Sequence, residues 1–184
     1  IGPAIENGFY YDFDLPRPLT DADLETITKN MRKIINSGRE FVRKEVTREE
    51  AKEIFKNQKY KLELLEAIPE GETVTTYTQG SFTDLCRGPH VESTKELCAD
   101  GFKLLSIAGA YWRGNEKNKM LTRIYATAWG SKEDLRAYMD HLADIEKRDH
   151  RKLGKELDLF SLHEEAGPGL VYWHPRGARI RQTI

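Results

Sequence analysis

The segment from Thr83 to His90 concentrates side chains that can do chemistry. Within eight residues it holds a carboxylate, a thiol, a guanidinium and an imidazole, which belong to Asp84, Cys86, Arg87 and His90. The whole chain has only two cysteines and five histidines, so one of each at a spacing of four residues is notable. This segment is therefore the first place to look for a site.

The backbone around Gly88 indicates how Cys86 and His90 meet. Gly88 precedes a proline, which disfavours helix and favours extended or polyproline II geometry. We expect a strand over residues 81–85 that ends at Cys86, followed by a tight turn. That turn would bring His90 back beside Cys86.

Three chemistries, as well as plain packing, are open to such a pair. As a zinc site, Cys86 and His90 supply two ligands, whereas a structural site needs four and a catalytic site three. As a cysteine hydrolase, Cys86 would need His90 as its base and a group such as Asp84 to orient it. As a water site, His90 or Cys86 would orient or deprotonate water near a cation such as Lys61 or Arg87. The other histidines are scattered: His141, His150, His163 and His174.

Length and composition set the frame for these alternatives. The 184 residues fit one domain, or one domain plus pieces of another, with 39% apolar and 32% charged residues and a net charge of -1. Two cysteines favour a reduced, cytoplasmic protein. The absence of a long apolar run or signal-peptide pattern argues against membrane insertion and secretion. Because the chain begins at Ile1 without a methionine, we expect a piece of a longer polypeptide.

Hydrophobic periodicity predicts an α+β fold with packed helices and a largely antiparallel sheet. Asn7-Gly8 predicts a type I′ hairpin turn within residues 1–13, and Gln79-Gly80 a turn between two later strands. Thr20 with Asp23, and Thr47 with Glu50, are capping boxes that begin helices. Further strands are expected at residues 41–46, 73–78, 81–85, 102–107, 120–128 and 170–173.

Three predicted helices carry Lys61, the basic segment and the C-terminal tail. Residues 60–68 predict a short helix in which Lys61, on pattern alone, is a solvated charge. A helix beginning at Ser131 and continuing to Lys155 would be about 37 Å long, and its thin apolar stripe is typical of a connector. Its last part, residues 147–155, is strongly basic and fits either a solvated face or a phosphate contact. A helix cut short is expected over residues 178–184, in a tail that opens a second domain.

Several segments, in this order, are similar to bacterial-type threonyl-tRNA synthetases. The resemblance covers essentially the whole chain. It implies three parts: an editing domain shared with alanyl-tRNA synthetases over residues 1–130, a linker helix over 131–157, and the start of a class II catalytic domain over 158–184. The segments that carry it are Ile1-Gly-Pro-Ala-Ile-Glu-Asn-Gly-Phe-Tyr-Tyr-Asp-Phe13, Cys86-Arg-Gly-Pro-His90, Ala110-Tyr-Trp-Arg-Gly114, Lys147-Arg-Asp-His-Arg-Lys-Leu-Gly154, Glu156-Leu-Asp-Leu-Phe160 and Tyr172-Trp-His-Pro-Arg-Gly177.

The resemblance implies an activity for the Cys86–His90 turn. The family attaches threonine to tRNA(Thr) with ATP, and its editing domain hydrolyses mischarged seryl-tRNA(Thr) by water attack on the aminoacyl ester. Carried over residue by residue, His90 and Lys61 would activate water or polarise the ester, and Cys86 would line the site. Asp84 would grip the serine, and the substrate would also contact Tyr11 and, by our expectation, Arg87.

The chain departs from the family pattern in one respect. The His-x-x-x-His pair that completes the family's editing site is absent, so zinc at Cys86 and His90 would need ligands from elsewhere. The resemblance places ATP, Mg²⁺ and a further zinc ion in a catalytic domain outside this chain, and it implies a homodimer. A second hypothesis is a non-catalytic tRNA-binding module in which the basic helix and Arg113 contact phosphates.

Overall fold

The computed structural model describes residues 2–167 and 169–184. It divides into two compact units, Ile1–Leu135 and Arg136–Ile184. Two predicted features extend outside the described residues. These are the first residue of the N-terminal hairpin, Ile1, and the middle of the loop at residues 167–169, Pro168.

The α+β prediction is confirmed, and every strand pair in the described chain is antiparallel. The predicted single sheet is replaced by three, with strand orders β1-β2-β7-β6, β3-β4-β5 and β8-β9. The strands are β1 (Ala4–Ile5), β2 (Gly8–Phe13), β3 (Val42–Val46), β4 (Val74–Gln79), β5 (Phe82–Leu85), β6 (Phe102–Tyr111), β7 (Met120–Ala128), β8 (Phe160–Leu162) and β9 (Val171–Trp173).

Six α-helices and three short 3-10 helices accompany these strands in the described residues. The α-helices are α1 (Asp21–Asn36), α2 (Arg48–Ile54), α3 (Lys59–Glu66), α4 (Lys132–Lys147), α5 (His150–Glu156) and α6 (Pro175–Thr183). The 3-10 helices are η1 (Thr94–Glu96), η2 (Trp112–Gly114) and η3 (Glu164–Ala166). None of the helices formed by residues 2–167 and 169–184 has the length and apolar character that a membrane span requires.

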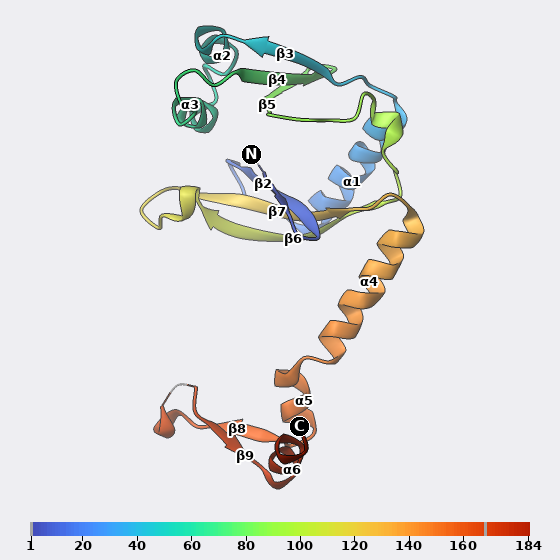
Figure 1. Cartoon of the computed structure of the whole chain (residues 1–184), viewed down its shortest axis with the longest axis vertical. Coiled ribbons are helices and arrows are strands. Elements are labelled where there is room, and N and C mark those ends of the chain that lie inside the picture. Colours follow the sequence, from blue (N-terminus) through green and yellow to red (C-terminus); the bar gives the residue numbers. More distant parts are fainter. Residues whose placement is uncertain (1, 168) are drawn as a thin grey trace. The chain divides into compact units, whose positions relative to one another are not determined.

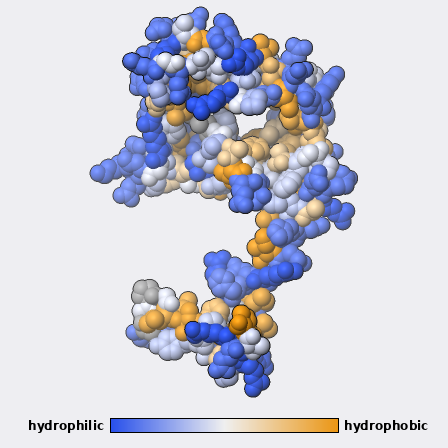
Figure 2. Space-filling view, in the orientation of Figure 1, coloured by the Kyte–Doolittle hydropathy of each residue, from blue (hydrophilic) through white to orange (hydrophobic). Residues whose placement is uncertain are grey.

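The first unit contains two sheets that form separate layers (Figure 1). Helix α1 accompanies the four-stranded sheet, while α2 and α3 lie at one end of the three-stranded sheet. A buried apolar cluster joins β3 and β4 to these two short helices through Val46, Ala51, Leu65 and Val74. The space-filling view shows the surface hollowed between the two layers (Figure 2).

Both predicted capping boxes are confirmed. The Thr20 amide donates to an Asp23 carboxylate oxygen at 2.8 Å, at the start of α1. At the start of α2, the Thr47 amide donates to Glu50 at 2.8 Å, and the Glu50 amide donates back to the Thr47 hydroxyl at 3.1 Å. Each box satisfies backbone N–H groups that a helix start leaves unpaired.

The N-terminal hairpin is confirmed, but its turn lies one residue earlier than predicted. Strand pairing joins Ile5 to Gly8, so Glu6 and Asn7 form the loop, and neither has a positive φ. Gly8 serves a different purpose, since a Cβ there would lie 2.2 Å from the carbonyl oxygen of Ala126 on β7. The glycine permits close approach of two strands rather than a type I′ turn.

The turn between β4 and β5 is also displaced by one residue, but it lies one residue later than predicted. Gln79 pairs with Phe82, so the turn is formed by Gly80 and Ser81, with Gly80 at φ +61°. The predicted strands otherwise agree with the structure within a residue or two, except that β6 continues to Tyr111. This hairpin delivers Asp84 and Cys86 to the hollow between the layers.

The prediction of one continuous helix from Ser131 to Lys155 is wrong, because the structure has two helices there. Helix α4 ends at Lys147, and α5 begins after Asp149, whose side chain accepts a hydrogen bond from the Arg151 amide at 2.8 Å. An aspartate that caps a new helix competes with continuation of the old one, which is why the basic run does not extend α4. The 16 residues of α4 correspond to about 24 Å.

The rest of the second unit is a short hairpin and a helix. Strand β9 was predicted, whereas its partner β8 was missed. Helix α6 begins at Pro175, three residues before the predicted start, and proline is well suited to a first helical position. Apolar side chains lie on the surface of this unit (Figure 2), among them Leu162 and Tyr172, which are 63% and 50% exposed.

Candidate active site

A cleft of about 660 Å³ in the first unit is lined by every residue predicted to act in or contact the ester-hydrolysing site. These residues are Tyr11, Lys61, Asp84, Cys86, Arg87 and His90. They come from both sheets and from α3, and they span most of the length of the unit. The structure therefore gathers into one place residues that are far apart in the sequence.

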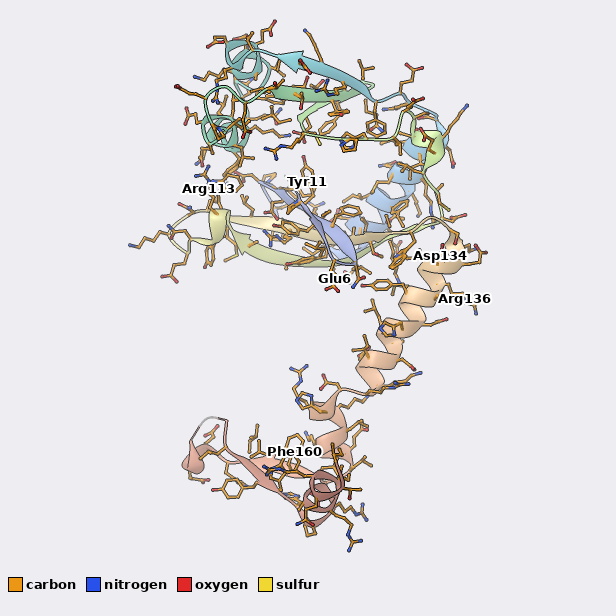
Figure 3. All side chains as sticks on the ribbon, in the orientation of Figure 1. Glu6, Tyr11, Arg113, Asp134, Arg136 and Phe160 are labelled. Atoms are coloured by element: carbon orange, nitrogen blue, oxygen red, sulfur yellow. The ribbon has the colours of Figure 1, made fainter. Side chains whose placement is uncertain are left out.

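Three elements deliver the polar centre of the cleft. Tyr11 lies in the middle of β2, where it pairs with Ile124 of β7, and Figure 3 shows it on the side of the other layer. Lys61 lies in the first turn of α3. Asp84 lies near the end of β5, opposite Tyr77 of β4.

Asp84 holds the other two side chains. One of its carboxylate oxygens pairs with the ammonium of Lys61 and also accepts from the Leu85 amide at 2.6 Å. The other accepts a hydrogen bond from the Tyr11 hydroxyl at 2.5 Å. A carboxylate has about four lone-pair positions, so this network leaves roughly one for a substrate.

Burial changes the acid–base properties of this centre. The Lys61 side chain is only 9% exposed and lies between the rings of Phe55 and Phe82, 5.5 and 5.9 Å from its Nζ. Burial lowers the pKa of Lys61 to about 8, because a charged ammonium is disfavoured away from water. Burial also raises the pKa of Tyr11, and negative charge on the Cys86 thiol would raise it further.

The predicted approach of Cys86 and His90 is confirmed. The Nε2 of His90 lies 3.1 Å from the sulfur of Cys86, and the Gly88 amide donates to the same sulfur at 3.4 Å. The backbone of Cys86 continues the β4 pairing, since its amide donates to the Thr75 carbonyl at 3.2 Å. The Cys86 thiol thus lies just after the end of β5, and the turn at Gly88 brings the His90 imidazole beside it.

The prediction for Gly88 itself is wrong. Its φ is +72°, in the left-handed region, and the peptide bond to Pro89 is cis. A Cβ at this position would lie 2.1 Å from the Tyr77 hydroxyl. The bias of residues before proline toward extended geometry depends partly on a Cβ, which glycine lacks.

Arg87 is the most peripheral of the predicted residues. Its side chain is 89% exposed and pairs with Glu72 at 3.2 Å. Such an exposed pair contributes little to stability, about 0–1 kcal/mol, and is easily exchanged for another anion. Arg87 therefore lies at the rim, away from the buried centre.

Aromatic walls of the cleft were missed by sequence reasoning. The His90 ring stacks on Phe41 at 5.3 Å between centroids and meets the edge of Tyr77 at 4.4 Å. Phe82, at the tip of the β4–β5 hairpin, is 57% exposed beside Lys61. The only signal available in advance was that Tyr77 and Phe82 flank a predicted turn in alternating strands.

The described residues do not fit a bound metal ion. No group of three or more His, Cys, Asp or Glu side chains within residues 2–167 and 169–184 is arranged to hold one. Cys86 and His90 are two ligands, short of the three that a catalytic zinc site needs, and they face each other.

The basic segment of the second unit is partly engaged with acidic neighbours. Arg148 pairs with Asp144 at 3.0 Å, and Arg151 pairs with Asp149 at 2.7 Å. In the first unit, Arg113 donates to the Glu63 carbonyl oxygen at 3.1 Å. The side chains of Arg148 and Arg151 are 79% and 80% exposed, so their ion pairs, like that of Arg87, are weak and open to exchange for another anion.

Comparison with known proteins shows what the chain is similar to. A family model described as the threonyl and alanyl tRNA synthetase second additional domain matches residues 74–125. The threonine–tRNA ligase of Borrelia recurrentis is 53% identical over all 184 residues, and that of Magnetococcus marinus is 56% identical over the whole chain. Along its whole length the chain is similar to a segment of these threonine–tRNA ligases.

The matches cover only part of the relatives and include part of the cleft. The chain spans 32% of the Borrelia recurrentis ligase and 28% of the Magnetococcus marinus ligase. The second additional domain match begins at β4 and includes Asp84, Cys86 and His90. Tyr11 and Lys61 precede the matched region and are brought to it by the fold.

Proposed function

We propose that the first unit hydrolyses mischarged seryl-tRNA(Thr). The observation that carries this proposal is the shared cleft, in which a buried Lys61–Asp84–Tyr11 network lies with the Cys86–His90 pair. The match of residues 74–125 to the threonyl and alanyl tRNA synthetase second additional domain supports the same conclusion.

A separate hydrolytic site is needed because a threonine-binding pocket discriminates poorly against serine. Threonine and serine differ by one methyl group, and a pocket separates such a pair by only about 1–3 kcal/mol, or roughly 10–200-fold. A site that removes serine after its attachment improves this ratio. A cleft holding polar groups for a hydroxyl and an ammonium suits that task.

His90 is the proposed proton acceptor. Histidine is the side chain whose ordinary pKa lies nearest neutral pH, which suits a general base. The oxygen of a water molecule bonds to the ester carbonyl carbon while its proton passes to the imidazole. The ester C–O bond then breaks, the ribose oxygen takes a proton, and free serine and tRNA are released.

Lys61 is the proposed electrostatic partner of the ester. With a pKa of about 8, most of Lys61 is an ammonium at neutral pH. It has three N–H donors, of which one is used by Asp84, so others can reach a carbonyl oxygen that gains negative charge. Asp84 holds Lys61 and Tyr11 in place and offers its remaining capacity to the serine ammonium or hydroxyl.

The polypeptide to which this segment belongs is proposed to form threonyl-tRNA from threonine, ATP and tRNA(Thr). In that scheme residues 1–130 are the editing domain, 131–157 a linker, and 158–184 the beginning of a class II catalytic domain. ATP, Mg²⁺ and zinc would bind in that catalytic domain, and the enzyme would be a cytoplasmic homodimer.

A non-catalytic tRNA-binding module is the alternative. It would rely on the basic residues 147–155 and on Arg113, and its affinity for tRNA would fall steeply with salt. The exposed Arg148 and Arg151 are available for such contacts, whereas the shared cleft favours hydrolysis.

The direct test is deacylation of purified seryl-tRNA(Thr) and threonyl-tRNA(Thr) by the native polypeptide. The proposal expects release of serine well above the spontaneous rate, with threonine released at least tenfold more slowly. Binding of both tRNAs without release of either amino acid favours the module instead.

A further inference from the structure

The candidate active site depends on the alignment of two sheets that share no strand pairing in the described chain. Tyr11 belongs to the four-stranded sheet, while Asp84 belongs to the three-stranded sheet and Lys61 to the adjacent α3. Backbone ladders therefore do not fix Lys61 relative to Tyr11. Side-chain contacts do so, both the Tyr11–Asp84 hydrogen bond and the contacts between α3 and the four-stranded sheet.

Such contacts occur beside α3, and we call their residues the α3 latch: Asp14, Tyr60, Glu63, Trp112, Arg113 and Lys119. The indole Nε1 of Trp112 donates to a Glu63 carboxylate oxygen at 2.7 Å. Asp14, just after β2, accepts from the Tyr60 hydroxyl at 2.9 Å and pairs with Lys119 at 2.5 Å. The Tyr60 and Trp112 rings meet edge to face at 4.9 Å.

Trp112 is a rigid anchor for this latch. It is 9% exposed, its amide donates to the Lys119 carbonyl at 3.1 Å, and its own carbonyl accepts from the Asn118 side chain at 2.9 Å. Arg113, at the end of the β6–β7 hairpin beside α3 (Figure 3), has a φ of 55°. A non-glycine residue in this region is strained, and it persists only where its surroundings hold it. Here its guanidinium is held by the Glu63 carbonyl.

Glu63 connects the anchor to the site through α3. Glu63 and Lys61 are two residues apart, which on a helix places their side chains on roughly opposite faces. Any shift or rotation of α3 that breaks the Glu63 contact also moves the Lys61 ammonium. The helix has only eight residues and no side-chain cap. Buried Leu65 packs it against the three-stranded sheet, and the latch fixes its other side against the four-stranded sheet.

We propose that the Trp112–Glu63 hydrogen bond positions Lys61 against Asp84 and Tyr11, so that Glu63 and Trp112 are positioning residues for ester hydrolysis. This inference rests on the proposed function of the cleft for its kinetic consequence. Its structural consequence, the placement of Lys61, is independent of any substrate.

The pKa of the Lys61 amine reports where this side chain lies, independently of any hydrolysis rate. The titratable groups that share its cleft are Asp84, Cys86 and Arg87 from the β5 segment, Tyr77 from β4, Tyr11 from β2, and His90 beyond the Gly88 turn. A neighbouring pocket that Lys61 also lines adds Asp12, Asp14, Lys59 and Tyr60. While α3 is latched, burial holds the pKa of Lys61 near 8. If α3 shifts, water reaches the ammonium and the pKa rises toward its ordinary value of 10.5.

The experiment compares Glu63→Ala and Trp112→Phe with Glu66→Ala in the native polypeptide. Glu66 is an exposed glutamate on the same helix, so it is a matched control. Single-turnover hydrolysis of seryl-tRNA(Thr) gives the rate. Competitive acetylation of lysines across pH, read by peptide mass spectrometry, gives the pKa of Lys61 directly.

We expect Glu63→Ala and Trp112→Phe to lower the rate at saturation about 10–100-fold, with KM changed less than about threefold, because catalysis is sensitive to displacements near 1 Å. Both variants raise the Lys61 pKa by at least one unit. Glu66→Ala changes neither quantity. Glu63→Gln, which keeps an oxygen acceptor for the indole N–H, restores most of the rate and the low pKa.

A second comparison separates positioning from loss of fold. The double variant Glu63→Ala/Trp112→Phe is expected to be no worse than either single variant, because both remove one interaction. The proposal is overturned if the Lys61 pKa stays near 8 in Glu63→Ala, whatever the rate does, or if only KM changes. If the unaltered protein releases no serine, the proposed function fails. The acetylation measurement then still tests whether the Trp112–Glu63 hydrogen bond positions Lys61.

Discussion

The ammonium of Lys61 on α3 pairs with the carboxylate of Asp84 on β5, and only 9% and 19% of the two side chains are exposed. The same carboxylate accepts the Tyr11 hydroxyl from the other sheet at 2.5 Å. One buried acid therefore links three elements at the wall of the cleft. A pair so enclosed is costly to desolvate, and its retention is easier to explain by function than by stability.

The first prediction concerns stability at high pH. The folded-state pKa of Lys61, about 8, lies below the ordinary value of 10.5. Between these values the unfolded chain binds more protons at this residue, so the free energy of unfolding gains a positive contribution as pH rises from about 8 to 10.5. The contribution is lost as pH falls through 8. Its slope approaches about 1.4 kcal/mol per pH unit.

Urea unfolding at several pH values measures this slope. Lys61→Met is expected to remove the rise between pH 8 and 10.5, whereas Lys59→Met, on the same helix but with an exposed side chain, retains it. Equal slopes for the two variants would show that burial of Lys61 does not perturb its titration.

The second prediction concerns the turn that returns His90 to Cys86. Gly88→Ala is expected to be destabilising by more than the roughly 1–2 kcal/mol that a left-handed conformation costs, because the new Cβ would lie 2.1 Å from the Tyr77 hydroxyl. Tyr77 contacts the His90 ring, so hydrolysis of seryl-tRNA should also slow.

Gly71 offers a matched control for this substitution. Its φ is +89°, and a Cβ there meets nothing within 4 Å. Thermal or urea unfolding of Gly71→Ala should show the backbone cost alone, with hydrolysis unchanged. If Gly88→Ala is no more destabilising than Gly71→Ala, the close packing of Tyr77 on this turn is not energetically important.

The third prediction separates water attack from a covalent thiol mechanism. The 3.1 Å contact of Cys86 with His90 is within the range of a nucleophile and its base. If water is the nucleophile, Cys86→Ala keeps a substantial fraction of the hydrolysis rate, within about tenfold. Mass spectrometry of the protein quenched during turnover should detect no serine attached to Cys86. A complete loss of activity together with a trapped thioester in the unaltered protein would contradict water attack.

The fold was predicted well where local chemistry determines it. The capping boxes at Thr20 and Thr47 fix helix starts through contacts three residues apart, which a sequence displays directly. The turn predictions near Gly8 and Gly80 were each one residue off. At Gly8 the reason is non-local, since the glycine serves a close approach to Ala126, more than a hundred residues away.

The helix from Ser131 was predicted to be longer than it is. The capping residue Asp149 is visible in the sequence, but the continuing periodicity was given more weight. Periodicity and charge continue through residues 147–155, whereas Asp149 provides a capping carboxylate that begins a new helix. Asparagine, aspartate and serine side chains compete with helical hydrogen bonds in this way. The competition cannot be decided from periodicity alone.

The site was predicted in part by pattern and in part by resemblance. The approach of Cys86 and His90 followed from a strand, a glycine and a proline within five residues. Lys61, in contrast, has the sequence context of a solvated charge, and its burial depends on Asp84 and Phe82 from a separate hairpin. The side-chain contact between Trp112 and Glu63 joins two elements that are distant in sequence, so no local sequence pattern predicts it.

The hydrolysis of seryl-tRNA(Thr) by the native polypeptide and by His90→Ala tests the central claim most directly. His141→Ala is the matched control, because His141 is exposed on α4 and lines no part of the cleft. Loss of a general base costs about 10²–10⁴-fold, so His90→Ala should release serine at least about 100-fold more slowly, and His141→Ala at the unaltered rate. Equal rates for His90→Ala and the unaltered protein would contradict the account.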